Sequence, residues 1–131
     1  AMLAIFPVNE KTDNVEEACA NCLAAAQSVH EQLSIWSKER KEQGASAVKS
    51  GIALHIGEVV YGNIGTPGRL DFTVIGEAVN RVARVEGMCT SLGESLLATE
   101  EFTSHIPDST TCLGEFSLKG IQAPVKIFSL N

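Results

Sequence analysis

The sequence predicts an α+β fold in which helices pack on a mixed, mainly antiparallel sheet. Two long segments have apolar residues at the three- and four-residue spacing of a helix, and other segments have the two-residue alternation of strands. The chain has 131 residues, of which 44% are apolar and 20% are charged, and this is the composition of an ordinary globular domain. We therefore expect residues 1–131 to form a single domain.

The chain begins with a short apolar stretch and a long helix. Residues 1–6 are apolar throughout, which is typical of a strand that is entered partway, so we expect the fold to be truncated at its N-terminus. The helix is expected from Asn14 to about Lys41, with Asp13 or Asn14 as its cap and Gly44 at its end. Its apolar face is expected to consist of Val15, Ala18, Cys19, Cys22, Ala25, Ala26, Val29, Leu33 and Trp36.

Strands are expected next, because the apolar spacing changes to two. Residues 48–56 and 59–64 are predicted as two strands, and the glycines between them favour an antiparallel hairpin. Gly62 and Gly65 are expected to be a bulge and a terminator in the second of these strands. A turn at residues 66–68 then leads to a short strand over residues 70–75.

The second half of the chain returns to helical spacing from Glu77 to about Leu92. A short strand is expected over residues 95–98, and Thr99 is expected to cap a short helix. Residues 111–118 and 125–130 are predicted as two closing strands of the same sheet.

Charge and cysteine content exclude several classes of function. The net charge of −6 argues against a surface for nucleic acid or an anionic membrane, and no apolar run approaches the roughly 20 residues of a membrane helix. We therefore expect no nucleic-acid partner and no membrane contact by this segment. The four cysteines lack a secretory context, which favours a cytoplasmic location. Cys19 and Cys22 have the spacing of a redox or metal motif, but their place inside a helix without further ligands favours a packing role.

The most informative segment is the start of the second helix, from Gly76 to Arg84. Asn80 and Arg84 are four residues apart and therefore lie on one face of a helix. Arginine offers a planar, permanently charged set of donors for phosphate, and asparagine offers both donors and an acceptor. Taken alone, the segment favours an ordinary solvated helix face, so its function depends on the motifs around it.

Three blocks of the sequence together resemble the catalytic domains of class III nucleotidyl cyclases. They are GxxxHxGxVxxGNIG over residues 51–65, DFTVIGEAVN over residues 71–80 with Ala83, Arg84 and Glu86 after it, and GEFxLKG over residues 114–120 with Pro124 and Val125 after it. The resemblance covers essentially the whole chain. It implies a ferredoxin-like class III cyclase fold, a single partial catalytic domain and a head-to-tail homodimer with two composite active sites.

The resemblance also implies a reaction. In this family the ribose 3′-oxygen attacks the α-phosphorus of the nucleotide, and for ATP the products are 3′,5′-cyclic AMP and pyrophosphate, made for signal transduction. Two divalent cations, Mg or Mn, are carried by two aspartates in segments that have no match here, so we expect no metal ligands in this chain and no turnover by it alone. The alternative is a catalytically dead cyclase-like module for dimerisation or nucleotide sensing.

Four residues receive roles from the resemblance. Asn80 matches the asparagine that orients the ribose, and Arg84 matches the arginine that stabilises charge on the α-phosphate in the transition state. Lys119 matches the lysine that contacts the terminal phosphates, and the alternative for this residue is a solvated lysine at a strand end. Thr73 stands where adenylyl cyclases hold a residue that reads the adenine amino group. Guanylyl cyclases usually have cysteine there, so ATP is expected over GTP.

Overall fold

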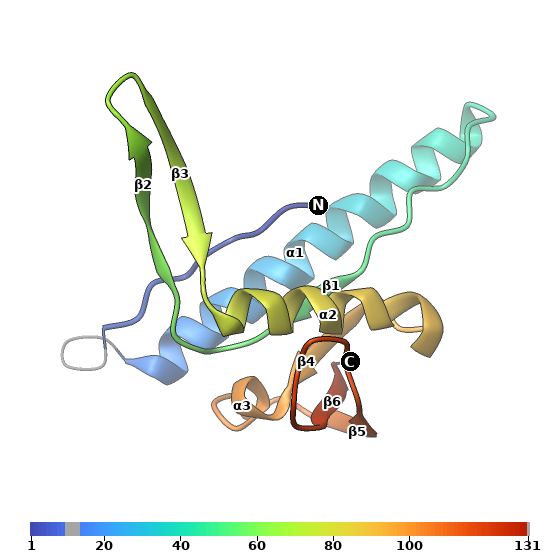
Figure 1. Ribbon diagram of the computed structural model, residues 1–131. Coiled ribbons are helices and arrows are strands. Elements are labelled where there is room, and N and C mark those ends of the chain that lie inside the picture. Colours follow the sequence, from blue (N-terminus) through green and yellow to red (C-terminus); the bar gives the residue numbers. More distant parts are fainter. Residues whose placement is uncertain (10–13, 131) are drawn as a thin grey trace.

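The computed structural model describes residues 1–9 and 14–130, except for the side chains of residues 64 and 69–72. Three helices and six strands follow one another in the described part of the chain (Figure 1). The elements are α1 (Val15–Glu42), β1 (Ile52–Leu54), β2 (Val60–Thr66), β3 (Arg69–Ile75), α2 (Glu77–Leu92), β4 (Leu96–Thr99), α3 (Glu100–Thr103), β5 (Thr110–Phe116) and β6 (Val125–Leu130). None of the helices in these residues is long and apolar enough to cross a membrane.

In the described part of the chain, four strands form the main sheet in the order β1-β4-β6-β5. Strand β1 is parallel to β4, whereas β4 and β6, and β6 and β5, are antiparallel. The prediction of an α+β fold with a mixed, mainly antiparallel sheet is therefore confirmed. Strand β4 is buried along its whole length, because helices cover both faces of the sheet there.

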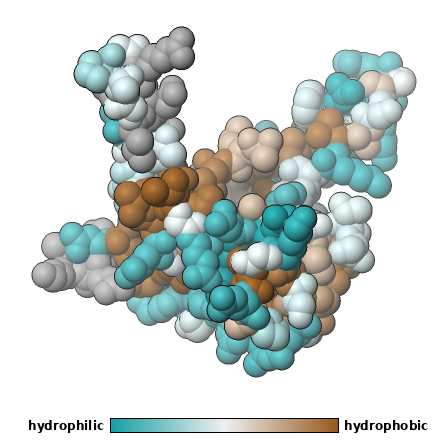
Figure 2. All heavy atoms as spheres, in the orientation of Figure 1, coloured by the Kyte–Doolittle hydropathy of each residue, from teal (hydrophilic) through white to brown (hydrophobic). Residues whose placement is uncertain are grey.

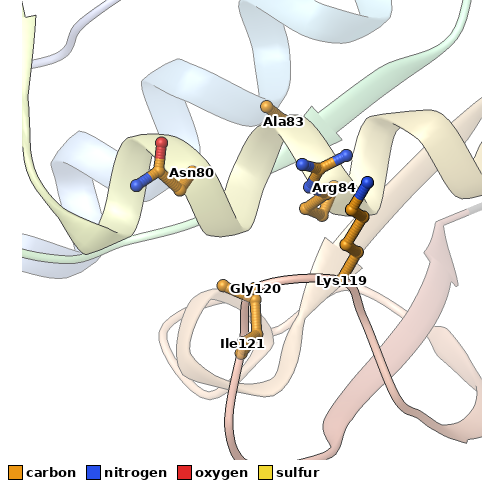
Figure 3. Close-up of a pocket in the computed structure, with 6 residues that line it drawn as sticks. All are labelled: Asn80, Ala83, Arg84, Lys119, Gly120 and Ile121. Atoms are coloured by element: carbon orange, nitrogen blue, oxygen red, sulfur yellow. The ribbon is translucent and has the colours of Figure 1, made fainter.

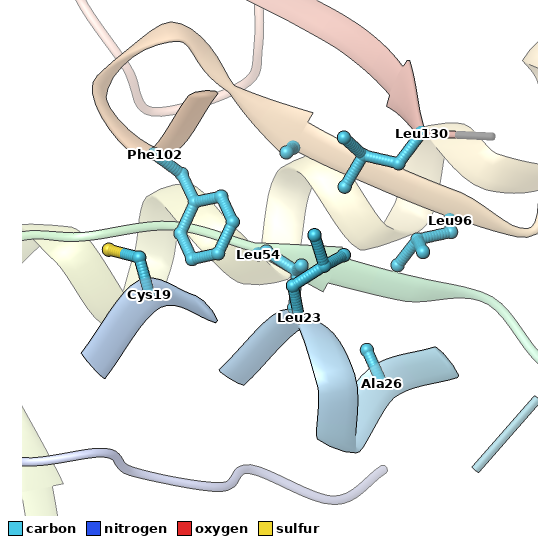
Figure 4. Close-up of a cluster of buried hydrophobic side chains, with 8 residues drawn as sticks. Cys19, Leu23, Ala26, Leu54, Leu96, Phe102 and Leu130 are labelled. Carbon is cyan, nitrogen blue, oxygen red and sulfur yellow. The ribbon is translucent and has the colours of Figure 1, made fainter. Parts of the chain in front are cut away.

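The two long helices cover opposite faces of this sheet. On one face, Cys19, Leu23 and Ala26 of α1 pack against β1, β4 and Phe102, which is 2% exposed (Figure 4). On the other face, Val85 and Cys89 of α2 lie in a second cluster, which they share with Leu97, Leu118, Val125 and Ile127. Alternate residues of a strand point to opposite faces, so Leu96 and Leu97 belong to different clusters.

Both ends of α1 have local causes in the sequence. The Asn14 side chain accepts a hydrogen bond from the Glu17 backbone N–H at 3.1 Å, which confirms one of the two predicted caps; the other candidate, Asp13, lies outside the described residues. After the helix, Gly44 adopts a φ of +80°, a conformation that suits glycine. Trp36 is not in the core, because it is 48% exposed and stacks under the Arg40 guanidinium.

The predicted pairing of the first two strands is wrong. Strand β2 pairs with β3 and not with β1, and the two form a hairpin that stands away from the main sheet (Figure 1). The register runs without a shift from Val60 opposite Ile75 to Thr66 opposite Arg69, so Gly62 is not a bulge and Gly65 does not end the strand. The turn at Pro67 and Gly68 is the connection that decides this pairing.

Two further strand predictions are wrong or too long. Residues 1–9 form no strand, and Met2 is 96% exposed. The predicted strand over residues 48–56 is reduced to β1, because Val48 is held by α1 through two hydrogen bonds with the Ser37 hydroxyl, at 2.8 and 2.9 Å.

Thr99 precedes α3 as predicted, but its hydroxyl does not cap the helix. It lies 2.7 Å from Nδ1 of His55, and Thr99 itself is fully buried. This hydrogen bond fixes the end of the β1 segment to the end of β4. Burial lowers the pKa of His55 below its usual range, and the nearby Arg81 lowers it further, against the opposite effect of Glu101 and Glu77.

Candidate functional site

A hollow of about 340 Å³ lies between α2 and the loop that joins β5 to β6. Its volume falls in the range of small-ligand pockets. It is open to solvent, and its lining is polar on the α2 side (Figure 3). The lining residues are Asn80, Ala83, Arg84, Lys119, Gly120 and Ile121.

Helix α2 supplies one wall of the hollow. Asn80 and Arg84 are exposed and lie on the same wall, one turn apart, as the spacing predicts. Ala83 lies between them, and its small side chain leaves the wall open. Val85, the next residue after Arg84, is fully buried against the sheet, and this burial fixes which way the helix faces.

The loop after β5 supplies the other wall. Leu118 is 7% exposed and belongs to the same buried cluster as Val85. Leu118 precedes Lys119 and Val85 follows Arg84, so the same core anchors the backbone beside both cations. The Ile121 N–H donates to the Leu118 carbonyl at 3.1 Å, and Gly120 turns the loop with a φ of +82°. In Figure 3 the side chains of Arg84 and Lys119 extend toward the same end of the hollow.

The described residues do not neutralise the positive charge in this hollow. Among the residues that the structure describes, neither Arg84 nor Lys119 makes an ion pair, and no acidic residue lines the hollow. Arg81 provides the contrast on the same helix, because it donates to Glu77 at 2.8 Å and to Glu101 at 3.2 Å. Two cations that share a hollow and lack a carboxylate favour the binding of an anion there.

Thr73 lies outside this group of residues. It is half-buried on β3, opposite Gly62, and it is not part of the lining of the hollow. It shares one face of the hairpin with Val60 and Ile75, which are 64% and 51% exposed. In Figure 2 an apolar patch lies near the base of the hairpin, and hydrophilic residues gather beside it over α2.

Sequence reasoning identified Asn80, Arg84 and Lys119 but did not identify the rest of the wall. Ala83 has a signal in the sequence, because it is three residues from Asn80 and therefore on the same side of the helix. Gly120 and Ile121 follow Lys119 directly, and only the turn in the folded chain brings them to the hollow.

The two divalent cations that the resemblance implies do not fit the described residues. No group of three histidine, cysteine, aspartate or glutamate side chains in residues 1–9 and 14–130 lies close enough to hold a metal ion. Cys19 and Cys22 are both free thiols in α1, and burial raises the pKa of Cys22 to about 11, with the nearby Cys19 adding to the effect. This shift disfavours the thiolate that metal binding and redox chemistry need.

Comparison with solved structures defines the class of fold. The adenylyl cyclase CyaB from P. aeruginosa superposes with a TM-score of 0.76 over 92% of this chain and 62% of that one, at 24% identity. The guanylyl cyclase Cya2 superposes with a TM-score of 0.73 over 93% of this chain and 61% of that one, also at 24% identity. At this identity the likeness establishes the fold, which is that of class III cyclase domains.

Sequence relatives agree with the fold, although no family model matches the chain. An adenylate cyclase from Anabaena cylindrica is 34% identical over 131 residues, which are 97% of this chain and 24% of the relative. Adenylate cyclase 1 from Rhizobium meliloti is 29% identical over 91% of this chain and 18% of the relative. The chain belongs to the class III adenylyl/guanylyl cyclase domains. It spans about a quarter of the length of these relatives or less.

Proposed function

We propose that the hollow between α2 and the 119–121 loop is the ribose- and phosphate-binding side of a cyclase active site, which converts ATP to 3′,5′-cyclic AMP and pyrophosphate. The observation that carries this proposal is the pair of cations, Arg84 and Lys119, that share the hollow with Asn80 and have no acidic partner among the described residues. A triphosphate would neutralise both cations in one binding event.

Arg84 is the residue proposed to act on the reacting phosphate. The ribose 3′-hydroxyl gives up its proton to a base that is proposed to lie outside the described residues, and its oxygen bonds to the α-phosphorus. The bond from that phosphorus to the pyrophosphate oxygen breaks, and negative charge is redistributed over the phosphate oxygens. The Arg84 guanidinium can donate to the α-phosphate oxygens at this stage, because no carboxylate of the described residues is paired with it. The buried Val85 beside it anchors the backbone from which the Arg84 side chain extends.

Asn80 and Lys119 are proposed to hold the substrate on either side of this centre. Asn80 lies one turn before Arg84, so its amide can bond the ribose while Arg84 contacts the α-phosphate. Lys119, on the opposite wall, would take the terminal phosphates and stabilise the departing pyrophosphate. These contacts bind the substrate and orient it for in-line attack.

Thr73 is proposed to read the base. Its hydroxyl can accept a hydrogen bond from the adenine amino group, and the exposed Val60 and Ile75 on the same face of the hairpin offer apolar contact for a purine ring. Guanylyl cyclases usually have cysteine in place of this threonine, so the proposal expects ATP to be used in preference to GTP.

The remaining chemistry is proposed to come from outside the described residues. We propose a head-to-tail homodimer, in which each composite site combines this hollow with carboxylates and two divalent cations, Mg or Mn, held elsewhere. The described residues offer no donor set for these cations. The chain by itself is accordingly expected to bind ATP without turning it over.

The test is cyclic AMP formation by the protein that carries this chain, with ATP and Mn or Mg. Arg84→Ala is expected to lower kcat by about 100-fold or more, the usual effect of removing one transition-state donor. Arg81→Ala is the matched control, because it removes an arginine from the same helix that is bound by Glu77 and Glu101 and does not line the hollow. Equal activities of the two variants would defeat the proposal. ATP binding without any cyclic AMP from the wild type would instead favour the catalytically dead module.

A further inference from the structure

Helix α2 packs closely against the segment that contains β1 at two glycines, Gly51 before the strand and Gly57 after it. A Cβ placed on Gly51 would lie 2.8 Å from Cβ and 2.9 Å from Sγ of Cys89, near the C-terminal end of α2. A Cβ placed on Gly57 would lie 2.7 Å from Cβ of Ala78, in the first turn of α2. These separations are shorter than carbon atoms tolerate, so the absence of two side chains lets the helix come this close.

Glycine is needed at both positions because a side chain would not fit there, and not because of the backbone conformation. Neither Gly51 nor Gly57 has a positive φ, so an alanine would suit the backbone at either position. At Gly57 the neighbours have little room to move. Ala78 is held by the helix, and Nε2 of His55 would lie 3.1 Å from the added atom while Nδ1 of the same ring is fixed by Thr99 at 2.7 Å.

The two contacts enclose the part of α2 that forms the site. Ala78 and Cys89 lie near the two ends of the helix, and Asn80 and Arg84 lie between them. We propose that Gly51 and Gly57 are positioning residues: they set how closely α2 approaches the sheet and thereby align Asn80 and Arg84 with the 119–121 loop. This inference rests on the proposed function of that hollow.

A methyl group at residue 57 is expected to displace Asn80 more than Arg84. A methyl group at residue 57 pushes the first turn of α2 outward at Ala78, and Asn80 is only two residues, or about 3 Å along the axis, from that point. Arg84 follows less, because Val85 beside it is fully buried in the core. A relative shift of these two side chains disturbs the ribose more than the phosphates. It therefore lowers kcat with a smaller change in the KM for ATP.

The experiment exchanges one methyl group across the contact. We compare Gly57→Ala, Ala78→Gly and the double variant in the protein that carries this chain, and measure kcat, KM for ATP and Tm. Gly57→Ala is expected to lower kcat by about tenfold to 100-fold, the scale of a misplacement of about 1 Å. The double variant is expected to recover part of the lost kcat, because it removes the 2.7 Å contact with Cβ of Ala78 and leaves the 3.1 Å contact with Nε2 of His55. Gly87→Ala is the matched control, since a Cβ on this α2 glycine meets no atom within 4 Å.

Each outcome decides the inference. An unchanged kcat in Gly57→Ala, or a double variant no more active than Gly57→Ala, would overturn it, as would an equal loss in Gly87→Ala. If Gly57→Ala does not fold, the double variant is expected to fold and to be active, and its failure to do either would contradict the proposed contact. A Tm loss without a loss of kcat would mean that Gly57 serves stability alone. A wild type without cyclase activity would refute the proposed function instead, and recovery of Tm in the double variant would still test the contact.

Discussion

Replacement of Val85 by alanine is expected to destabilise the protein strongly, although the residue borders the solvent-exposed site. Val85 is fully buried, and its cluster includes Leu97 and Ile127, which are also fully buried. The variant removes two methyl groups at a point where α2 meets the middle of the sheet. The strands on one side and the helix backbone on the other prevent the surroundings from collapsing into the space.

The magnitude follows from the removed groups and the space that they leave. Two buried methyl groups account for about 1.6 kcal/mol of transfer free energy, and the cavity adds to this, so the free energy of unfolding should fall by about 2–3 kcal/mol. For a chain of this length the fall corresponds to a decrease in Tm of about 7–11 °C. This is a large part of the stability of a typical domain.

Urea denaturation followed by circular dichroism measures the effect, with an unchanged m-value as the sign of two-state unfolding. Val29→Ala is the matched control, because Val29 is 47% exposed on α1, and its change should stay within about 0.5 kcal/mol. If Val85→Ala lost no more than Val29→Ala, the burial of α2 on the sheet would be refuted. The account of how Arg84 and Lys119 are held would then fail as well.

Two further predictions concern pH and thiol chemistry. Burial lowers the pKa of His55, so the unfolded chain binds a proton on this residue more readily than the native protein does. The free energy of unfolding is therefore expected to be highest above the ordinary histidine pKa of about 6.5 and to fall as the pH drops from 7 to 5. Urea midpoints of His55→Gln should fall less over this range, and parallel pH profiles of variant and wild type would count against the assignment. Cys112 is exposed, whereas Cys22 is half-buried with its pKa raised to about 11, so iodoacetamide at pH 8 should label Cys112 much faster in the native protein. Mass spectrometry of the labelled peptides measures the two rates, and equal rates would be the contrary result.

The elements that could be predicted from the sequence are those with strong local signals. Helix α2 begins at Glu77 and ends at Leu92, as its apolar spacing predicts, and β6 also has its predicted bounds. The cap at Asn14 is an equally local feature. For the same reason Asn80 and Arg84 could be placed on one wall, because their four-residue spacing on a helix decides it.

The pairing of strands could not be predicted in this way. The alternation within residues 48–64 indicates extended chain but does not say which strand lies beside it, and β2 pairs with β3 across Pro67 and Gly68. Thr99 has the residue type of a cap, yet its hydroxyl bonds to His55, which is 44 residues earlier in the chain. Lys119 likewise lies near Asn80 and Arg84 only because Leu118 and Val85 pack in one core in the folded protein.

The central claim is that a nucleotide binds between α2 and the 119–121 loop. A crystal structure of the protein that carries this chain, with a non-hydrolysable ATP analogue, tests this claim most directly. We expect the ribose beside Asn80, the α-phosphate within hydrogen-bond distance of the Arg84 guanidinium, and the terminal phosphates at Lys119. A fully occupied nucleotide bound elsewhere, with Arg84 and Lys119 both in solvent, would contradict it.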